Sequence, residues 1–168
     1  MPRLTEISSK TIGKILQCIF NLEKPKDPLN NEQVDSSIAD SELHHIFPRK
    51  FVSKLDGWDE TKHNCDLILN CMKLTKKTNA RFLNDDPKVC FEEIKRKNGS
   101  NYLDHLSIQF LDQKCIDLLL KPNKKVKDFD DFISHREKLI LEQKIENIVL
   151  QNIKTNKALI FRVTLKFT

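Results

Sequence analysis

Glycine is scarce in this sequence, with three residues in 168, and tryptophan and tyrosine occur once each. Three glycines leave no glycine-rich loop of the kind that cradles nucleotide phosphates. No apolar run reaches the roughly eighteen residues of a transmembrane helix, and residues 1–5 are not followed by the apolar core of a signal peptide. We therefore expect a cytoplasmic protein with no membrane association.

Cysteine is present but lacks the spacing that would give it a structural task. The five cysteines form no Cys-x-x-Cys pair, and their number is odd. This pattern argues against a disulfide framework and against a zinc site made of four thiolates. Scattered thiols in a chain of this length are typical of a reducing cytosol.

Charged residues of both signs are abundant. Lys and Arg total 29 against 24 Asp and Glu, so the formal net charge is +5, and 32% of the residues are charged. Such a balance is compatible with a polyanionic partner, although it is too mild to identify one. The length favours one domain with its own core.

Helical spacing of apolar residues recurs at both ends of the chain. It predicts a helix over residues 8–22, followed by a polar connection over 23–41. Further on it predicts two or three amphipathic helices between residues 89 and 120, and a long helix that starts at Asp128. Strict alternation of Phe161, Val163, Leu165 and Phe167 with polar residues instead predicts a final strand. We expect residues 158–167 to pair with another strand, either in the same chain or in a second copy, because an unpaired apolar edge is a liability.

The middle of the chain has a different pattern. A short apolar stretch from Leu43 to Phe47 is stopped by a proline, which suits a brief strand, and Cys71 to Leu74 suits a second one. Thr75 is a good N-cap for a helix from Lys76 to about Leu83. The expected architecture is therefore mainly α, with a small strand–strand–helix unit inserted near residues 42–84.

This inserted unit carries the residues with the clearest chemistry. His44 and His45 stand together on the first strand, Asn70 precedes the second, and Asn79 lies in the first turns of the helix. A helix packed across a hairpin brings its first turn beside the first strand, so His44 and Asn79 face a common point. Neighbouring residues on a regular strand face opposite ways, so both histidines can serve one site only if the strand ends or twists there.

These residues and their order resemble the HNH, or ββα-metal, nucleases, and most closely the nuclease half of GmrSD-type restriction endonucleases. The strings that carry the resemblance are His44-His45-Ile46-Phe47-Pro48, Ile68-Leu69-Asn70, Leu74-Thr75, Thr78-Asn79 and Pro87, and the similarity extends over roughly residues 12–150, including Phe132, Ile133 and Arg136. The resemblance implies a helical domain with an embedded HNH finger over residues 42–84, helices over 85–155 and a terminal strand over 156–168.

The resemblance also implies a role for each site residue. His45 matches the general base, which suits an imidazole because its ordinary pKa lies near neutral pH. His44 and Asn79 match the ligands of one divalent metal ion, and Asn70 matches the asparagine that braces the loop between the strands. An imidazole and an amide oxygen suit Mg²⁺ or Mn²⁺, while the second imidazole in place of the usual aspartate also admits Zn²⁺ or Ni²⁺.

The implied activity is metal-dependent hydrolysis of DNA to leave a 5′-phosphate, within a restriction or phage-defence system that uses a nucleotide-hydrolysing or sensor partner. Six basic residues flank the site, and they either contact phosphate or form a solvated face: Arg49, Lys50, Lys73, Lys76, Lys77 and Arg81. Two other interpretations remain: a nucleic-acid-binding module with a degenerate site, and a structural or interaction protein. The first conflicts with retention of all four site residues, and the second leaves the paired histidines and asparagines unexplained.

Overall fold

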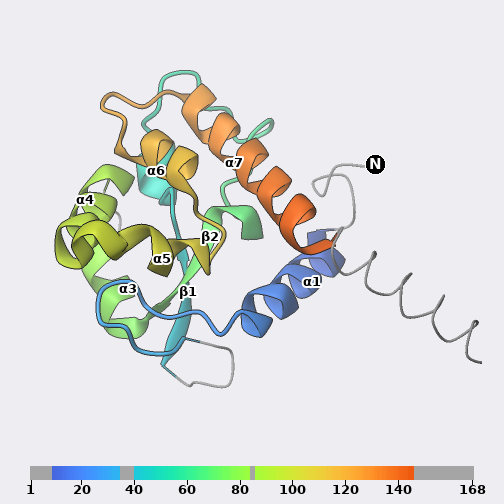
Figure 1. The fold of residues 1–168 in the computed structure, drawn as a ribbon. Helices are drawn as coiled ribbons and strands as arrows, with labels where there is room; N and C mark the ends of the chain where they lie inside the picture. Colours follow the sequence, from blue (N-terminus) through green and yellow to red (C-terminus); the bar gives the residue numbers. More distant parts are fainter. Residues whose placement is uncertain (1–8, 35–39, 84–85, 146–168) are drawn as a thin grey trace, which may run out of the picture.

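The computed structural model describes residues 9–34, 40–83 and 86–145, and within them the fold is mainly helical around one two-stranded sheet (Figure 1). No helix in these ranges is both long and apolar enough to cross a bilayer. The strand expected over 158–167 lies outside the described residues. The elements are α1 (Ser9–Leu22), β1 (Ser41–His45), α2 (Arg49–Val52), η2 (Ile68–Asn70), β2 (Cys71–Thr75), α3 (Lys76–Phe82), α4 (Pro87–Asn98), η3 (Gly99–Asn101), α5 (Tyr102–Ser107), α6 (Gln113–Leu120), α7 (Val126–Ile140) and η4 (Leu141–Ile145).

The two strands pair antiparallel, in a register that runs from Ser41 opposite Thr75 to His45 opposite Cys71. Helix α3 follows β2 directly and contacts both strands. Its first turn is capped as the sequence predicts, because the Thr75 side chain accepts a hydrogen bond from the Thr78 backbone N–H at 3.3 Å. The strand–strand–helix unit is therefore present where the sequence places it.

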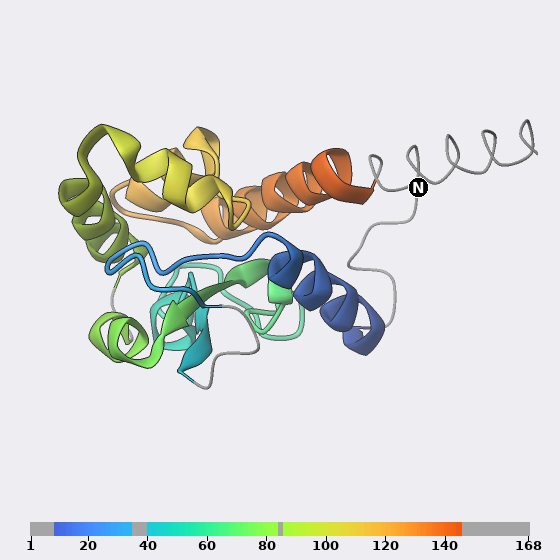
Figure 2. The same ribbon diagram turned by 60° about the horizontal axis from the view of Figure 1, so that its bottom comes forward.

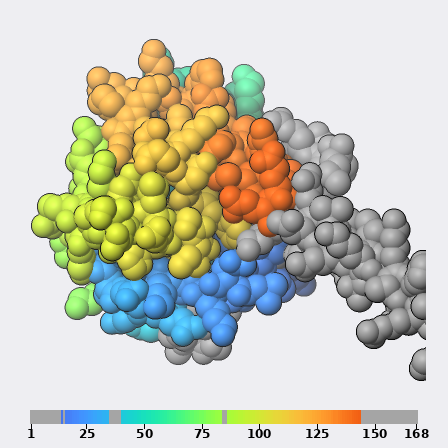
Figure 3. Space-filling view, in the orientation of Figure 1, coloured from blue at the N-terminus to red at the C-terminus, as the bar shows by residue number. Residues whose placement is uncertain are grey.

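The molecule has two layers, which Figure 2 shows from the side. Helices α4 to α7 form one layer, and the hairpin with α1 and α3 forms the other. The space-filling view in Figure 3 shows residues 87–140 covering most of one face, with residues 16–34 beside them. Phe47 joins the layers, since its ring lies 5.4 Å from that of Phe129 and 5.2 Å from that of Phe132 on α7. Burial of each such ring stabilises the fold by about 1.5–3 kcal/mol.

The connection after α1 is more than a polar linker, which corrects the sequence-based expectation. Leu29 and Val34 are buried, and Asp27 is completely buried. The Asp27 carboxylate accepts hydrogen bonds from the backbone N–H of Thr75 at 2.8 Å and from its hydroxyl at 2.9 Å. These bonds attach the connection to the end of β2, a contact between residues 48 positions apart that no local pattern reveals.

Arg136 of α7 ties the two layers together from inside the core. Its side chain is fully buried, and it donates to the carbonyl oxygens of Leu69 and Cys71, both at 2.7 Å, and of Gln109 at 2.8 Å. Burial lowers the pKa of Arg136 to about 10, so the guanidinium stays charged at neutral pH. Because Leu69 and Cys71 flank Asn70, this one side chain fixes the backbone around a candidate site residue.

Candidate active site

The end of β1 meets the first turn of α3 through His44 and Asn79. The His44 ring nitrogen Nδ1 lies 2.8 Å from the amide oxygen Oδ1 of Asn79, within hydrogen-bond distance. His44 is 5% exposed, and its ring packs 6.2 Å from that of Phe82, one turn further along α3. The helix therefore brings together the two residues that the sequence assigned to a common point.

The protonation state of His44 follows from its surroundings. Burial is the largest influence and lowers the pKa of His44; the hydrogen bond with Asn79 opposes this, and the neighbouring His45 lowers the pKa further. The imidazole is therefore neutral at physiological pH. The Asn79 oxygen can only accept, so this hydrogen bond has the proton on Nδ1. Binding of a metal ion through Nδ1 would require the other tautomer, with the proton on Nε2 and a lone pair on Nδ1.

Glu42 orients Asn79 and was not identified from the sequence. Its carboxylate oxygen Oε2 accepts a hydrogen bond from the amide nitrogen Nδ2 of Asn79 at 2.6 Å, so the amide oxygen faces His44. The signal was available, because residues two apart on a strand share a face and Glu42 lies two positions before His44. Such an outer contact fixes a ligand in its binding orientation.

His45, the residue after His44, faces the same site as His44. Both histidines line a cavity of about 190 Å³, together with Leu43, Pro48, Arg49, Asn79 and Leu83. Strand β1 ends at His45, and the chain then changes direction toward Pro48. This break in the strand resolves the objection that adjacent strand residues face opposite ways. The His45 side chain is 34% exposed, and its Nε2 donates to Asp66 at 3.2 Å.

Asn70 braces the chain around this cavity. Its amide nitrogen donates to the carbonyl oxygens of Phe47 at 2.9 Å and Cys65 at 2.8 Å, and its amide oxygen accepts from the Phe47 N–H at 2.9 Å. The residue is completely buried. Asn70 thus joins the segment after His45 to the loop before β2, and it does not reach the cavity lining. Its role here is positional.

The imidazole nitrogen of His44 and the amide oxygen of Asn79 could together hold one divalent ion. Two neighbouring ligands of an octahedral ion, each about 2.1 Å from it, lie about 3 Å apart. The 2.8 Å between Nδ1 and Oδ1 is close to that spacing. Only two protein ligands leave most coordination positions for water and phosphate oxygens, which is usual for Mg²⁺ in phosphate-processing sites.

Five of the six candidate phosphate contacts are exposed, namely Arg49, Lys50, Lys76, Lys77 and Arg81. Arg49 pairs with Asp66, Lys76 with Asp40 and Arg81 with Glu93.

Lys73 does not belong to that exposed set, and its assignment there was wrong. It is 4% exposed, and its ammonium group donates to Asn21 Oδ1 at 2.5 Å. The reason is that β2 is buried on both faces. One face is covered by α1 and by the segment that follows it, so alternation along the strand does not bring any side chain to solvent.

A second group of possible ligands lies between α6 and α7. The ligand atoms of Asp112, Cys115 and His135 all lie within 4.8 Å of one another and could hold a metal ion. Hydrogen bonds within this group already occupy the Asp112 carboxylate without a metal ion. Asp112 caps α6 by accepting from the Cys115 N–H at 2.9 Å, and it accepts from His135 Nε2 at 2.8 Å. Burial raises the pKa of the Cys115 thiol to about 12, and the charge of the neighbouring Arg136 guanidinium works against a second cation. We assign these residues to helix capping.

Comparison with known proteins finds no match to this chain among family models, curated proteins or solved structures.

Proposed function

We propose that this protein is a divalent-metal-dependent endonuclease of the HNH type that hydrolyses phosphodiester bonds in DNA and leaves a 5′-phosphate. The proposal rests on one observation: His44, His45 and Asn79, from a strand and a helix that meet, line a single cavity. In this proposal β1, β2 and α3 form the ββα-metal finger. Phosphodiester hydrolysis needs an oriented water and positive charge near the developing negative charge, and the cavity offers groups for both.

His45 acts as the general base. Its imidazole is partly exposed at the cavity, so it can reach a water molecule while one ring nitrogen stays hydrogen-bonded to Asp66. A base placed in this way contributes about 10²- to 10⁴-fold to a reaction rate. Asn70 contributes indirectly, because it fixes the backbone that follows His45.

His44 and Asn79 hold the metal ion, either Mg²⁺ or Mn²⁺, with Zn²⁺ or Ni²⁺ as further candidates. When bound, the ion acts as a Lewis acid at the phosphate. Glu42 keeps the Asn79 oxygen directed at the ion through the hydrogen bond to its amide nitrogen. The exposed basic residues around the cavity bind the phosphates on either side: Arg49, Lys50, Lys76, Lys77 and Arg81.

The biological setting is also a proposal. The resemblance to GmrSD-type enzymes supports a restriction or phage-defence role in the cytoplasm, with a nucleotide-hydrolysing or sensor partner supplied by another subunit or domain. A second copy of this chain, in a homodimer, is a further candidate partner.

The division of roles is testable by metal titration of single variants. We expect His44→Ala and Asn79→Ala to weaken Mn²⁺ binding about 10-fold or more, because each removes a ligand from a site with only two. His45→Ala should bind Mn²⁺ within about 2-fold of the unmodified protein yet lose cleavage by about 100-fold or more. Isothermal titration calorimetry and a cleavage assay on the same preparations measure both. If His45→Ala loses the metal and His44→Ala keeps it, the two roles are reversed.

A further inference from the structure

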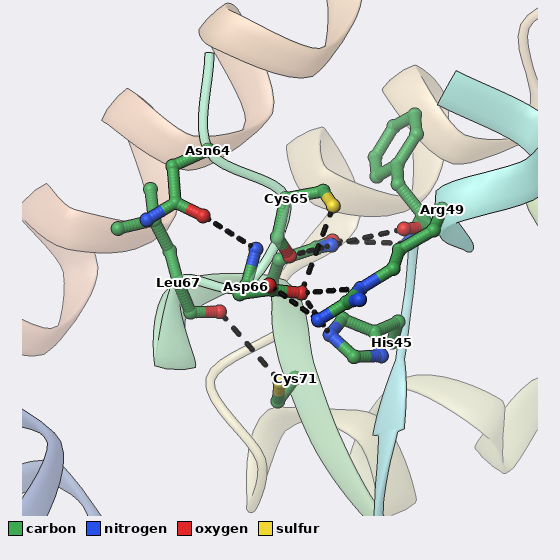
Figure 4. A network of polar contacts seen from close by, with 9 residues as sticks. His45, Arg49, Asn64, Cys65, Asp66, Leu67 and Cys71 are labelled. Carbon is green, nitrogen blue, oxygen red and sulfur yellow. Dashed lines mark hydrogen bonds and ion pairs between the residues drawn. The ribbon is translucent and has the colours of Figure 1, made fainter. Parts of the chain in front are cut away.

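A carboxylate from the loop before β2 reaches the general base (Figure 4). His45 Nε2 donates to Asp66 Oδ1 at 3.2 Å, and Arg49 donates to the same oxygen through Nε at 2.7 Å and to Oδ2 through Nη2. The Asp66 backbone N–H is itself held by Asn64 Oδ1 at 2.9 Å. Asp66 lies 21 positions after His45, and no sequence pattern pairs the two.

The loop that carries Asp66 is anchored to the rest of the site. The carbonyl of the preceding residue, Cys65, accepts from the buried Asn70 amide at 2.8 Å. Partial burial raises the pKa of the Asp66 carboxyl, but the hydrogen bonds and charge of Arg49 outweigh this and hold the pKa below its usual value. The group is therefore a carboxylate throughout the physiological range and only accepts hydrogen bonds.

We propose that Asp66 is the positioning residue of His45. Its carboxylate accepts a hydrogen bond from Nε2–H, and this leaves the lone pair of His45 on Nδ1 for the attacking water. This inference rests on the proposed nuclease function. Imidazole has two ring nitrogens, and the hydrogen bond made by one of them decides which of the two carries the proton in the neutral ring. A carboxylate behind the base also stabilises the imidazolium that forms when His45 takes a proton from water. The proton moves from water to Nδ1, and the proton on Nε2 stays there.

Arg49 completes the arrangement on the other side of the carboxylate. Its two donors fit both oxygens of Asp66, as a planar guanidinium does and an ammonium does not. Arg49 also lines two cavities. One is the cavity lined by His44 and His45, and the other, of about 220 Å³, is also lined by Asp66 and Trp58.

The test compares Asp66→Ala with a control variant, Asp59→Ala. Asp59 lies in the same loop, but its carboxylate lines neither cavity and accepts hydrogen bonds from Thr61, two residues further along. We expect Asp66→Ala to lower kcat about 10- to 100-fold, the usual effect of an outer-shell partner. DNA affinity should stay equal or rise, since a negative charge is removed and Arg49 is released. Asp66→Glu should recover part of kcat, and Asp59→Ala should change neither quantity by more than about 2-fold.

A readout independent of cleavage separates this inference from the nuclease proposal. The ¹⁵N chemical shifts of the His45 ring, assigned by loss of the signals in His45→Ala, report which nitrogen carries the proton. We expect a protonated Nε2 and an unprotonated Nδ1 in the neutral ring. A proton on Nδ1, or an unchanged kcat in Asp66→Ala, would overturn the inference. Absence of cleavage by the unmodified protein, with the Nε2 proton in place, would contradict the nuclease function and leave the Asp66 contact standing.

Discussion

His44 and Asn79 are joined by one hydrogen bond, and each of them also contacts a further residue of β1 or α3. Glu42 fixes the amide of Asn79, and the ring of Phe82 packs against His44. At the scale of single residues, the site is therefore prearranged by contacts within β1 and α3. That His44 and Asn79 lie beside each other was predictable because strand and helix periods are regular, but the same patterns did not identify Glu42.

Replacing Glu42 tests whether it orients Asn79 or binds the metal itself. Glu42→Ala removes the acceptor for the Asn79 amide nitrogen, so we expect Mn²⁺ affinity to fall about 10-fold or more. Glu42→Gln keeps an oxygen that accepts the same hydrogen bond, so affinity should stay within about 2-fold. Calorimetric titration of the two variants decides between the roles. An equal loss in both would mean that the charge of Glu42 matters, as it would for a ligand.

At the scale of elements, sequence patterns predicted the parts whose signals are local. The hairpin, the cap at Thr75 and the long helix all follow from alternation, helical spacing or a capping residue. The patterns did not predict the four-residue helix α2 (Arg49–Val52), which is too short for any periodicity. Nor did they predict that Asp27 bonds to Thr75 or that Lys73 is buried, because both depend on contacts between segments far apart in the chain.

The contacts of Arg136 between α7 and the other elements lead to a prediction about the free energy of unfolding. Arg136→Met should lower the free energy of unfolding by about 3 kcal/mol or more, since three buried carbonyl oxygens lose their donor, and an unsatisfied buried polar group costs about 1–3 kcal/mol. Arg96→Met, at a side chain that is 77% exposed, should cost less than about 0.5 kcal/mol. Urea unfolding measures both. A cost below about 1 kcal/mol for Arg136→Met would show that the carbonyls find other donors.

At the scale of the whole molecule, one layer supplies much of the core and the other carries the candidate site. The helices from α4 to α7 cover one face of the hairpin and supply the core partners of Phe47 and the guanidinium of Arg136. The other layer carries the cavity and the exposed basic side chains around it. A net charge of +5 adds a weak general attraction for polyanions, but the local arrangement decides where a phosphate would bind.

Salt dependence tests whether the basic residues near the cavity bind DNA. Removing one lysine–phosphate pair should reduce the log–log slope of DNA affinity against salt by about 0.9, so Lys50→Ala with Lys77→Ala should reduce it by about 1.8. The matched control is Lys114→Ala with Lys138→Ala, two exposed lysines of the helical layer, which should leave the slope unchanged. Fluorescence anisotropy at several salt concentrations provides the slopes. Equal slopes in the two double variants would remove these lysines from the DNA interface.

Plasmid cleavage tests the central claim most directly. The unmodified protein should convert supercoiled plasmid into nicked or linear DNA with Mg²⁺ or Mn²⁺, leave 5′-phosphate ends, and stop when EDTA removes the ion. His45→Ala, prepared in the same way and still binding Mn²⁺, should be slower by about 100-fold or more. Intact plasmid after incubation of the unmodified protein with each of Mg²⁺, Mn²⁺, Zn²⁺ and Ni²⁺, or equal cleavage by His45→Ala, would contradict the account.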